Sequence, residues 1–270
     1  MDSLLIKGGV PLHGDVTVSG AKNAVLPIMA ATLLTREKCV IRRVPDLSDV
    51  RFMAQILESL GAKVKVDGDV VTVCAAKPKS TGDYDLIRKM RGSICILGPL
   101  LGRQHHARVA LPGGCIIGTR PIDLHLKGMK NLGAVITIEG GYVDVKAKRL
   151  IGADIFLGGR AGPTVLGTAN VMMAAVLADG VTTIESAACE PEVVDLAYFL
   201  NKMGAKITGA GTRRIEIEGV KELHGADHSV IGHVSAARTR GSIAAWTMSP
   251  SKVPSITAAA SISRQACTTG

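Results

Sequence analysis

The sequence Leu57-Glu-Ser-Leu-Gly-Ala-Lys-Val-Lys-Val66 occurs in three similar versions and decides the fold of this chain. The second version is Met129-Lys-Asn-Leu-Gly-Ala-Val-Ile-Thr-Ile138, and the third is Leu200-Asn-Lys-Met-Gly-Ala-Lys-Ile-Thr208. Their central glycines are 72 and 71 residues apart. In each version the glycine suits the position just after a helix, and the alternating residues that follow it predict a strand. A repeat of this length, used three times, therefore organises the chain.

The residues around each version extend the repeat in both directions. A turn rich in glycine follows and leads into a second strand, so each version ends as a β-hairpin; these turns lie at 67–68, 140–141 and 209–211. The helix before the glycine is expected to begin near an acidic or hydroxyl residue; these starts lie at 48–49, 123 and 190–195. Further upstream, a turn enters another apolar helix and then a strand, at 39–43, 107–111 and 181–185.

Each copy thus has the order strand, helix, strand, helix, strand, strand (βαβαββ), and the three copies occupy residues 19–219. The Met, Leu and Ile stripes of the helices predict faces that point into a core. Three related units packed around one core predict a closed α/β domain with pseudo-threefold symmetry.

Two segments lie outside the three copies. Residues 4–18 resemble a pair of strands with a turn between them. After Ile231 the pattern stops: Ala, Ser and Thr dominate, and no Asp or Glu occurs from His228 to the last residue. Such a composition predicts a tail that is poorly ordered or foreign to the fold.

The positive charge of the chain is not concentrated in a way that suggests nucleic acid. The formal net charge is +9, of which Arg238, Arg240, Lys252 and Arg264 in the tail supply four. The remaining charge is spread widely, and three Phe, three Tyr and one Trp offer little surface on which bases can stack. Anionic small molecules are the expected partners, and nucleic acid is not.

The cysteines and the hydropathy indicate a compartment. No apolar run reaches membrane-spanning length, and the first residues lack the layout of a signal peptide. The six cysteines show no Cys-x-x-Cys pair and no metal-ligand spacing with histidine. These features predict a reduced, cytoplasmic protein without a membrane partner, in which most thiols act as small core residues.

The loop Leu111-Pro-Gly-Gly-Cys115-Ile-Ile-Gly-Thr-Arg120-Pro-Ile-Asp123-Leu-His125 carries the clearest chemical signal. Its apolar pattern gives no reason for a thiol at Cys115, whereas a nearby cation such as Arg120 favours a reactive thiolate. Asp123 suits the N-cap of the next helix. The alternative interpretation is a Pro/Gly turn that contains a small apolar residue.

The starts of the three copies place cations at comparable positions. Because the free N–H groups of a helix start favour anions, these positions predict a shared site for phosphate or carboxylate groups. The cationic and small residues concerned are Lys22 with Asn23, then Arg88, Lys89 and Arg91, then Arg160 with Gly162. The alternative is that each cation is simply a solvated surface residue.

Several of these motifs resemble those of the UDP-N-acetylglucosamine enolpyruvyl transferases (1-carboxyvinyltransferases). They are Gly20-Ala-Lys-Asn-Ala24, Arg91, the loop 111–125 and Glu190-Pro-Glu-Val-Val-Asp195. The resemblance runs from Met1 to Ile231. It implies a fold of two inside-out α/β barrels, each built from three such units. It also implies the first committed step of bacterial peptidoglycan synthesis: transfer of the enolpyruvyl group of phosphoenolpyruvate to the sugar 3-hydroxyl, with release of phosphate.

The resemblance also implies roles for individual residues. Cys115 is expected to protonate the enol carbon as general acid and to form a covalent adduct with phosphoenolpyruvate. Lys22 and Arg120 are expected to neutralise its phosphate, and Lys22 to stabilise the charge that develops as phosphate leaves. Asn23 is expected to position the sugar and the tetrahedral intermediate. No cofactor and no metal are expected, because protein cations serve the anions.

The nucleotide sugar is expected to bind a second set of residues. Arg91 and the segment 120–124 would hold it, with the uracil against the backbone of Pro121, Ile122, Asp123 and Leu124. The helix start formed by Arg160, Ala161 and Gly162 would face the diphosphate.

The resemblance ends where members of the family continue into a second barrel. Residues 1–18 are therefore expected to belong to that barrel, 19–229 to form the catalytic three-repeat barrel, and 230–270 to be a crossover strand with a tail foreign to the family. The aspartate that deprotonates the sugar hydroxyl belongs to the second barrel, so we expect a truncated or frame-shifted chain with impaired turnover. Two alternatives remain: a non-catalytic ligand-binding fragment, and a shikimate-phosphate enolpyruvyl transferase, which lacks the Cys loop.

Overall fold

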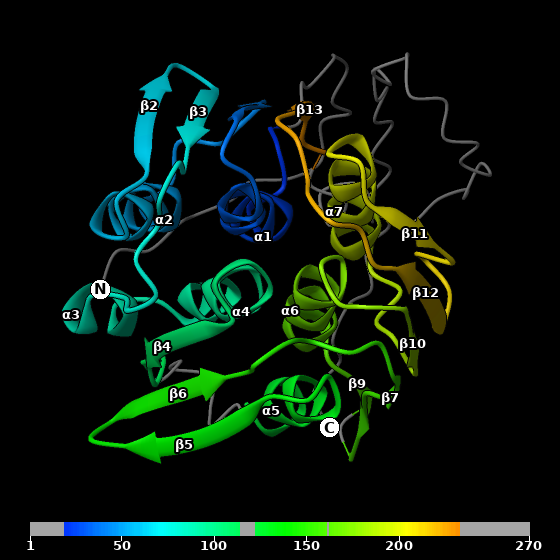
Figure 1. Ribbon diagram of the computed structural model, residues 1–270. Helices are drawn as coiled ribbons and strands as arrows, with labels where there is room; N and C mark the ends of the chain where they lie inside the picture. The colour runs from blue at the N-terminus through cyan, green and yellow to red at the C-terminus, as the bar shows by residue number, and fades with distance from the viewer. Residues whose placement is uncertain (1–18, 114–121, 161, 233–270) are drawn as a thin grey trace, which may run out of the picture. The chain divides into compact units, whose positions relative to one another are not determined.

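Three apolar helices form the interior of the domain that extends from Gly20 to Gly232. They are α1 (Lys22–Ala31), α4 (Leu97–Gln104) and α6 (Val165–Ala175). Every residue of α1 from position 24 on, and every residue of α6 from position 167 on, is buried. A helix that is apolar all round must be enclosed on all sides. Figure 1, from a computed structural model that describes residues 19–113, 122–160 and 162–232, shows these helices nearly end-on with the strands outside them.

Three further helices lie between the interior helices and the sheets. These are α2 (Ser48–Ser59), α5 (Asp123–Asn131) and α7 (Pro191–Lys202). Each ends in the same way, because the glycine after it has a φ of +93°, +94° or +99° at Gly61, Gly133 and Gly204. The next amide then donates to a carbonyl five residues back, as in Ala62 N to Leu57 O at 3.0 Å. This Schellman closure is the reason why the repeated Leu-Gly-Ala or Met-Gly-Ala sequence ends a helix three times.

The strands form three outer sheets with the same internal order. The first is β13-β1-β3-β2 and the third is β7-β10-β12-β11, read so that a parallel pair is followed by two antiparallel ones. The second is β4-β6-β5, with a single parallel bridge from Thr81 to Arg108 in place of a first strand. The bounds are β1 (Lys38–Arg42), β2 (Lys63–Asp67), β3 (Val70–Cys74), β4 (His106–Ala110), β5 (Val135–Glu139), β6 (Tyr142–Lys146), β7 (Asp154–Phe156), β10 (Val181–Glu185), β11 (Lys206–Thr208), β12 (Arg214–Glu218) and β13 (Asp227–Ser229).

Each copy also contains short elements. In the first copy, η1 (Thr32–Leu34) follows the inner helix α1. The second copy begins with α3 (Tyr84–Arg88) and η2 (Arg91–Ile96), and the third with the two-residue strands β8 (Gly158–Gly159) and β9 (Gly162–Pro163). Among the described helices, none combines the length and the apolar character needed to cross a membrane.

The predicted α/β fold of three βαβαββ units with helices inside and strands outside is confirmed, with one change in connectivity. The first sheet takes its outer parallel strand, β13, from the far end of the domain, where Ile41 is paired with His228. The three units therefore close into a ring, with β13 supplying what the first copy lacks. The proposed strands within 4–18 and the tail 233–270 lie outside the described residues.

Contacts between the copies include a half-buried arginine, Arg103. Arg103, on α4, donates from Nη1 to the carbonyls of Leu33, Thr35 and Ala75 at 2.7 Å, and from Nη2 to that of Ala76 at 2.8 Å. Burial lowers the pKa of this guanidinium. Arg103 thus joins the inner helix of the second copy to the end of η1 and to the chain that leaves β3.

Candidate functional site

Lys22 and Asn23 open the inner helix of the first copy. Lys22 is the first residue of α1, and its Nζ lies 2.9 Å from Oδ2 of Asp49 in the first turn of α2. The two side chains are 44% and 30% exposed, and Asn23 is exposed. A pair that open to solvent contributes at most about 1 kcal/mol. Lys22 can therefore exchange Asp49 for an anionic ligand at little cost.

Arg91 opens the corresponding part of the second copy. It is the first residue of η2 and is half-buried. Gly113, the last described residue before the Cys115 loop, lies against the end of α3, because a Cβ on Gly113 would collide with the carbonyl oxygen of Arg88. Cys115, Arg120 and Pro121 themselves lie outside the described residues.

The helix α5 begins at Asp123 as expected, but the structure corrects the expected N-cap role of Asp123. The N-cap of α5 is Ile122, which has no side-chain oxygen, and Asp123 is the first residue of the helix and exposed. Its carboxylate still lies in the first turn, where the helix dipole favours a negative charge. Leu124 is half-buried and lies against the third copy, since a Cβ on Gly159 would be 3.0 Å from its Cδ1.

The structure also corrects the expected helix start at Arg160–Gly162, where Ala161 lies outside the described residues. Gly158–Gly159 and Gly162–Pro163 pair as the strands β8 and β9, which places Arg160 in the turn between them, where it is exposed. The helix α6 begins only at Val165, and Thr164 caps it by accepting a hydrogen bond from the amide of Gly167 at 3.2 Å. Gly162 has a φ of +94°, which glycine adopts without strain and other residue types do not. The hairpin, rather than a helix start, is what lies beside Leu124.

A buried hydrogen-bond network connects α6 with α5, α4 and η2. Asn170 of α6 donates from Nδ2 to the carbonyl of Ile94 and to Nδ1 of His125, both at 2.9 Å, and its Oδ1 accepts from the amide of Gly98 at 2.8 Å. Burial, and then the positive charge of Arg91, lower the pKa of His125 to about 4. The imidazole is therefore neutral at pH 7, which leaves its Nδ1 free to accept the hydrogen bond from Asn170.

This pKa predicts a loss of stability in mild acid. Between pH 6.5 and pH 4 the unfolded chain binds a proton at His125 and the folded chain does not, so the free energy of unfolding falls as the pH falls. At pH 5 this contribution amounts to about 2 kcal/mol. Urea unfolding at pH 7 and pH 5 checks it against His125→Gln, which keeps an acceptor and does not titrate. Equal losses in the two proteins would contradict the prediction.

The structure thus places the described candidates at the starts of related elements. Lys22 and Asn23 lie on α1, Arg91 on η2, and Ile122 to Leu124 at the start of α5. Among the described residues, the contact of Leu124 with Gly159 brings the start of α5 to the β8–β9 hairpin, and Gly113 lies against the carbonyl of Arg88. Lys22 at the start of α1 and Arg91 at the start of η2 each supply a cation, which suits the binding of a phosphate or carboxylate.

Two partners of these residues escaped the sequence analysis. Asp49 was expected only as a helix start, although its position one residue into α2 makes it the partner of Lys22. Asn170 was not singled out, because only the Met, Leu and Ile residues of its helix were considered and expected to be core. The signal that marks it is a single amide side chain in a helix that is otherwise apolar on every face, because such a residue must find partners when buried.

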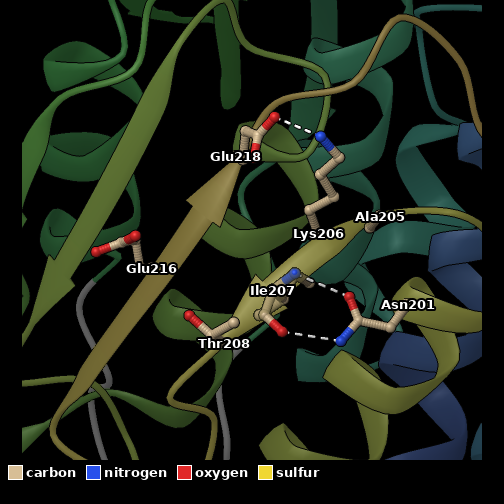
Figure 2. A pocket seen from close by; sticks show the side chains of 7 residues that line it. All are labelled: Asn201, Ala205, Lys206, Ile207, Thr208, Glu216 and Glu218. Atoms are coloured by element: carbon tan, nitrogen blue, oxygen red, sulfur yellow. Dashed lines mark hydrogen bonds and ion pairs between the residues drawn. The ribbon is translucent and has the colours of Figure 1, made fainter.

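A surface cavity of about 210 Å³ lies far along the third copy and holds none of the candidate residues. Figure 2 shows that two of its polar side chains already have partners: Asn201 binds both the amide and the carbonyl of Ile207 at 2.9 Å, and Lys206 pairs with Glu218. The Asn201 side chain thus satisfies backbone groups of β11 that none of the described strands pairs with. The cavity is therefore a feature of the sheet edge.

Comparisons with known proteins give the family. The model of the EPSP synthase (3-phosphoshikimate 1-carboxyvinyltransferase) family matches residues 6–260, a range that runs past Ile231, where the resemblance by motif ends. A protein of Methylacidiphilum infernorum named UDP-N-acetylglucosamine 1-carboxyvinyltransferase is 56% identical over 251 residues, which are 90% of this chain and 60% of that protein. A protein of the same name from Akkermansia muciniphila is 56% identical over 232 residues, 86% of this chain and 55% of that protein. The chain thus spans somewhat more than half the length of these curated relatives.

Solved structures agree with the fold. The enolpyruvyl transferase NikO from Streptomyces tendae matches with a TM-score of 0.73 and 26% identity, over 85% of this chain and 54% of that one. An EPSP synthase from Acinetobacter baumannii matches with a TM-score of 0.66 and 18% identity, over 85% of this chain and 52% of that one, and supports the fold alone. Since the family model matches residues 6–260, most of the sequence, this chain belongs to the EPSP synthase (3-phosphoshikimate 1-carboxyvinyltransferase) family.

Proposed function

We propose that this chain provides a site for transfer of the enolpyruvyl group from phosphoenolpyruvate to the 3-hydroxyl of UDP-N-acetylglucosamine, with release of phosphate. The observation that carries the proposal is the 56% identity to relatives named for that reaction over 90% of the chain. The cations at the starts of α1 and η2, together with the hairpin beside Leu124, support it, because both substrates carry phosphate groups.

The proposed roles are those that the resemblance implies. Lys22 and Arg120 bind the phosphate of phosphoenolpyruvate, and Lys22 stabilises the charge on that phosphate as its bond to carbon breaks. The Cys115 thiol gives its proton to the methylene carbon while the sugar oxygen bonds to the neighbouring carbon and releases its hydroxyl proton to water. The thiolate then takes a proton back from the new methyl group as phosphate leaves, which restores the double bond. Asn23, exposed next to Lys22, orients the sugar and the tetrahedral intermediate.

Arg91, the segment 120–124 and the hairpin at Arg160–Gly162 hold the UDP-sugar. The contact between Leu124 and Gly159 supports this grouping, because it brings the uracil-binding and diphosphate-binding segments of the proposal to one place. The free thiols of the described residues fit a reducing compartment, and we assign the reaction to the cytoplasm and to cell-wall synthesis.

Direct turnover tests the proposal. The 270-residue chain is incubated with phosphoenolpyruvate and either UDP-N-acetylglucosamine or shikimate 3-phosphate, and released phosphate is measured. Release of phosphate when UDP-N-acetylglucosamine is the acceptor, and not when shikimate 3-phosphate is, supports the proposal. Release of phosphate with shikimate 3-phosphate favours that acceptor instead. That acceptor is considered because the matched family model is described by it.

Mass spectrometry separates a binding half-site from an inert fragment. Addition of the Cys115 thiol across the double bond of phosphoenolpyruvate forms one S–C bond and moves one proton to carbon, so the chain gains the mass of one phosphoenolpyruvate. A label that depends on the UDP-sugar, without turnover, identifies a ligand-binding half-site. If the chain shows no label and no turnover, the proposal is contradicted.

Lys22→Ala is expected to weaken phosphoenolpyruvate binding at least about tenfold, the usual cost of a lost hydrogen bond between charged groups. Isothermal calorimetry in the presence of UDP-N-acetylglucosamine measures it. The matched control is Lys38→Ala, a lysine at the start of β1, for which binding is expected within about twofold of the starting protein. Unchanged affinity in Lys22→Ala would contradict the assigned role.

A further inference from the structure

The last described residues of the domain, 227–232, pass directly beside the start of α1, and we name them the crossover segment. The amide of Val230 donates to the carbonyl of Arg42 at 3.1 Å, which continues the pairing of β13 with β1. The carbonyl of Ile231 then accepts a hydrogen bond from the amide of Ala21 at 2.8 Å, and Gly232 forms an antiparallel bridge with Gly20. Because Ala21 is the N-cap of α1, the crossover segment holds the residue that precedes Lys22.

A buried carboxylate fixes the crossover segment from the other side. Oδ1 of Asp195, on α7, lies 2.9 Å from Nε2 of His228, and its Oδ2 accepts a hydrogen bond from the amide of Ile231 at 3.1 Å. The two side chains are 2% and 5% exposed. A single side chain of the third copy thereby sets the positions of both ends of the segment that reaches Ala21.

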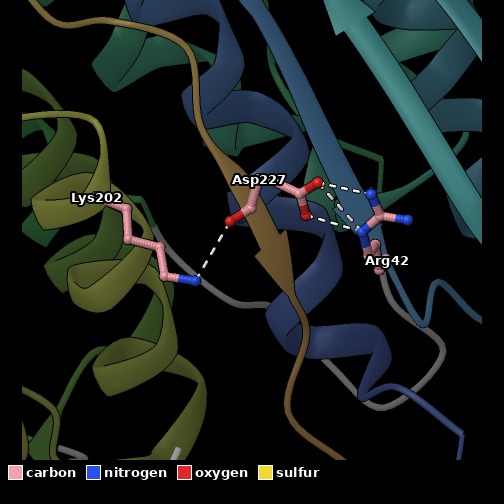
Figure 3. A network of polar contacts seen from close by, with 3 residues as sticks. All are labelled: Arg42, Lys202 and Asp227. Atoms are coloured by element: carbon pink, nitrogen blue, oxygen red, sulfur yellow. Dashed lines mark hydrogen bonds and ion pairs between the residues drawn. The ribbon is translucent and has the colours of Figure 1, made fainter.

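A second polar contact on the same strand differs in its surroundings. Figure 3 shows Arg42 on Asp227 in a two-fold contact, at 2.8 Å from Nε and 2.6 Å from Nη2, while Lys202 donates to the backbone carbonyl of Asp227 at 3.3 Å. Both side chains of this ion pair are about half exposed. It joins β13 to β1 at the surface and has no contact with Ala21 or Lys22 among those that the structure describes.

The buried pair is not the arrangement that stability alone favours. His228 packs its ring against Phe199, with centroids 5.5 Å apart, but its Nδ1 is buried and has no hydrogen-bond partner. An apolar side chain at this position would avoid that unsatisfied nitrogen. What an apolar side chain cannot do is hold Asp195 in the orientation in which Oδ2 receives the Ile231 amide.

We propose that Asp195 and His228 are positioning residues for Lys22 and Asn23: through Ile231 and Ala21 they set where the first turn of α1 begins. This inference rests on the proposed function only for the identity of the ligand. Asp49 holds the ammonium group of Lys22 from α2, while the crossover segment holds its backbone. A displacement of the first turn moves both Lys22 and Asn23 relative to a phosphate, and small displacements of binding groups are costly.

Asp195→Asn and His228→Gln test the proposal. In the first, one of the two acceptor oxygens becomes an NH₂ group that faces a donor; in the second, an amide can still donate to Asp195, so a smaller effect is expected. Asp227→Asn is the matched control, because it weakens the exposed contact on the same strand. The readouts are hydrogen exchange of the amides from Ala21 to Val25 and the affinity for phosphoenolpyruvate and for UDP-N-acetylglucosamine by calorimetry.

Asp195→Asn is expected to speed exchange of these amides roughly tenfold and to weaken phosphoenolpyruvate binding by a similar factor, with a smaller loss of UDP-sugar affinity through Asn23. His228→Gln retains most of the affinity, and Asp227→Asn retains all of it. Exchange in Asp195→Asn that is unchanged at α1 overturns the inference, and so does a complete loss of folding in both variants, which assigns the pair to global stability. If Lys22→Ala leaves phosphoenolpyruvate binding unchanged, the proposed function fails, but the exchange result still decides the coupling.

Discussion

Replacing Asn170 with leucine is expected to lower the free energy of unfolding by about 4 kcal/mol. The substitution leaves the amide of Gly98, the carbonyl of Ile94 and Nδ1 of His125 buried without partners, each at a cost of about 1–3 kcal/mol. Burial of the larger apolar side chain offsets part of this loss. Urea unfolding followed by circular dichroism at pH 7 measures the change.

The matched control is Asn201→Leu, because Asn201 also binds two backbone groups, at the edge of β11. Water replaces those contacts when the side chain is lost, so about 1 kcal/mol is expected. A loss of the same size in both variants would show that burial of the Asn170 network adds nothing. The backbones of α4 and α6 are in close contact at this point, since a Cβ on Gly98 would collide with the backbone carbonyl of Asn170.

Replacing Arg103 with methionine is expected to cost about 3 kcal/mol. Methionine keeps the apolar stem of the side chain. It leaves four carbonyl oxygens, two before β1 and two after β3, without the guanidinium that binds them. Lysine cannot reproduce the planar fork, so Arg103→Lys is expected to lose about half as much. Thermal or urea unfolding gives both values.

Arg51→Met is the matched control for Arg103. Arg51 makes a two-fold contact with Asp46, but the two side chains are 67% and 77% exposed. Exposed pairs of this kind contribute less than about 1 kcal/mol. Should Arg51→Met prove as damaging as Arg103→Met, the argument from buried carbonyl groups would be wrong.

The fold was largely predictable because the same helix-glycine-strand sequence occurs three times in the chain. The Leu-Gly-Ala or Met-Gly-Ala sequence stops each outer helix with a glycine of positive φ, and the alternating residues that follow form the hairpins where expected. The donation of β13 to the first sheet was not predictable. It depends on a pairing between residues near 40 and near 228, which no local pattern specifies.

The candidate site was predictable in composition but less so in its details. Lys22 and Arg91 stand at element starts as expected, because small residues and cations there are local signals. The error at 160–162 arose because Gly-Pro before Thr164 suits both a helix start and a hairpin end, and tertiary pairing with β8 decided for the hairpin. The partners Asp49 and His125 became visible only once folding had brought distant segments together.

The return of β13 to the first sheet has a consequence for how the domain melts. In a linear array of repeats, each outermost unit has one neighbour and frays first. Here α1 packs against η2 of the second copy and α7 of the third, and β1 pairs with β13, so none of the three copies is terminal. Opening any one of them breaks two interfaces at once, and the domain is built to unfold as a single cooperative unit.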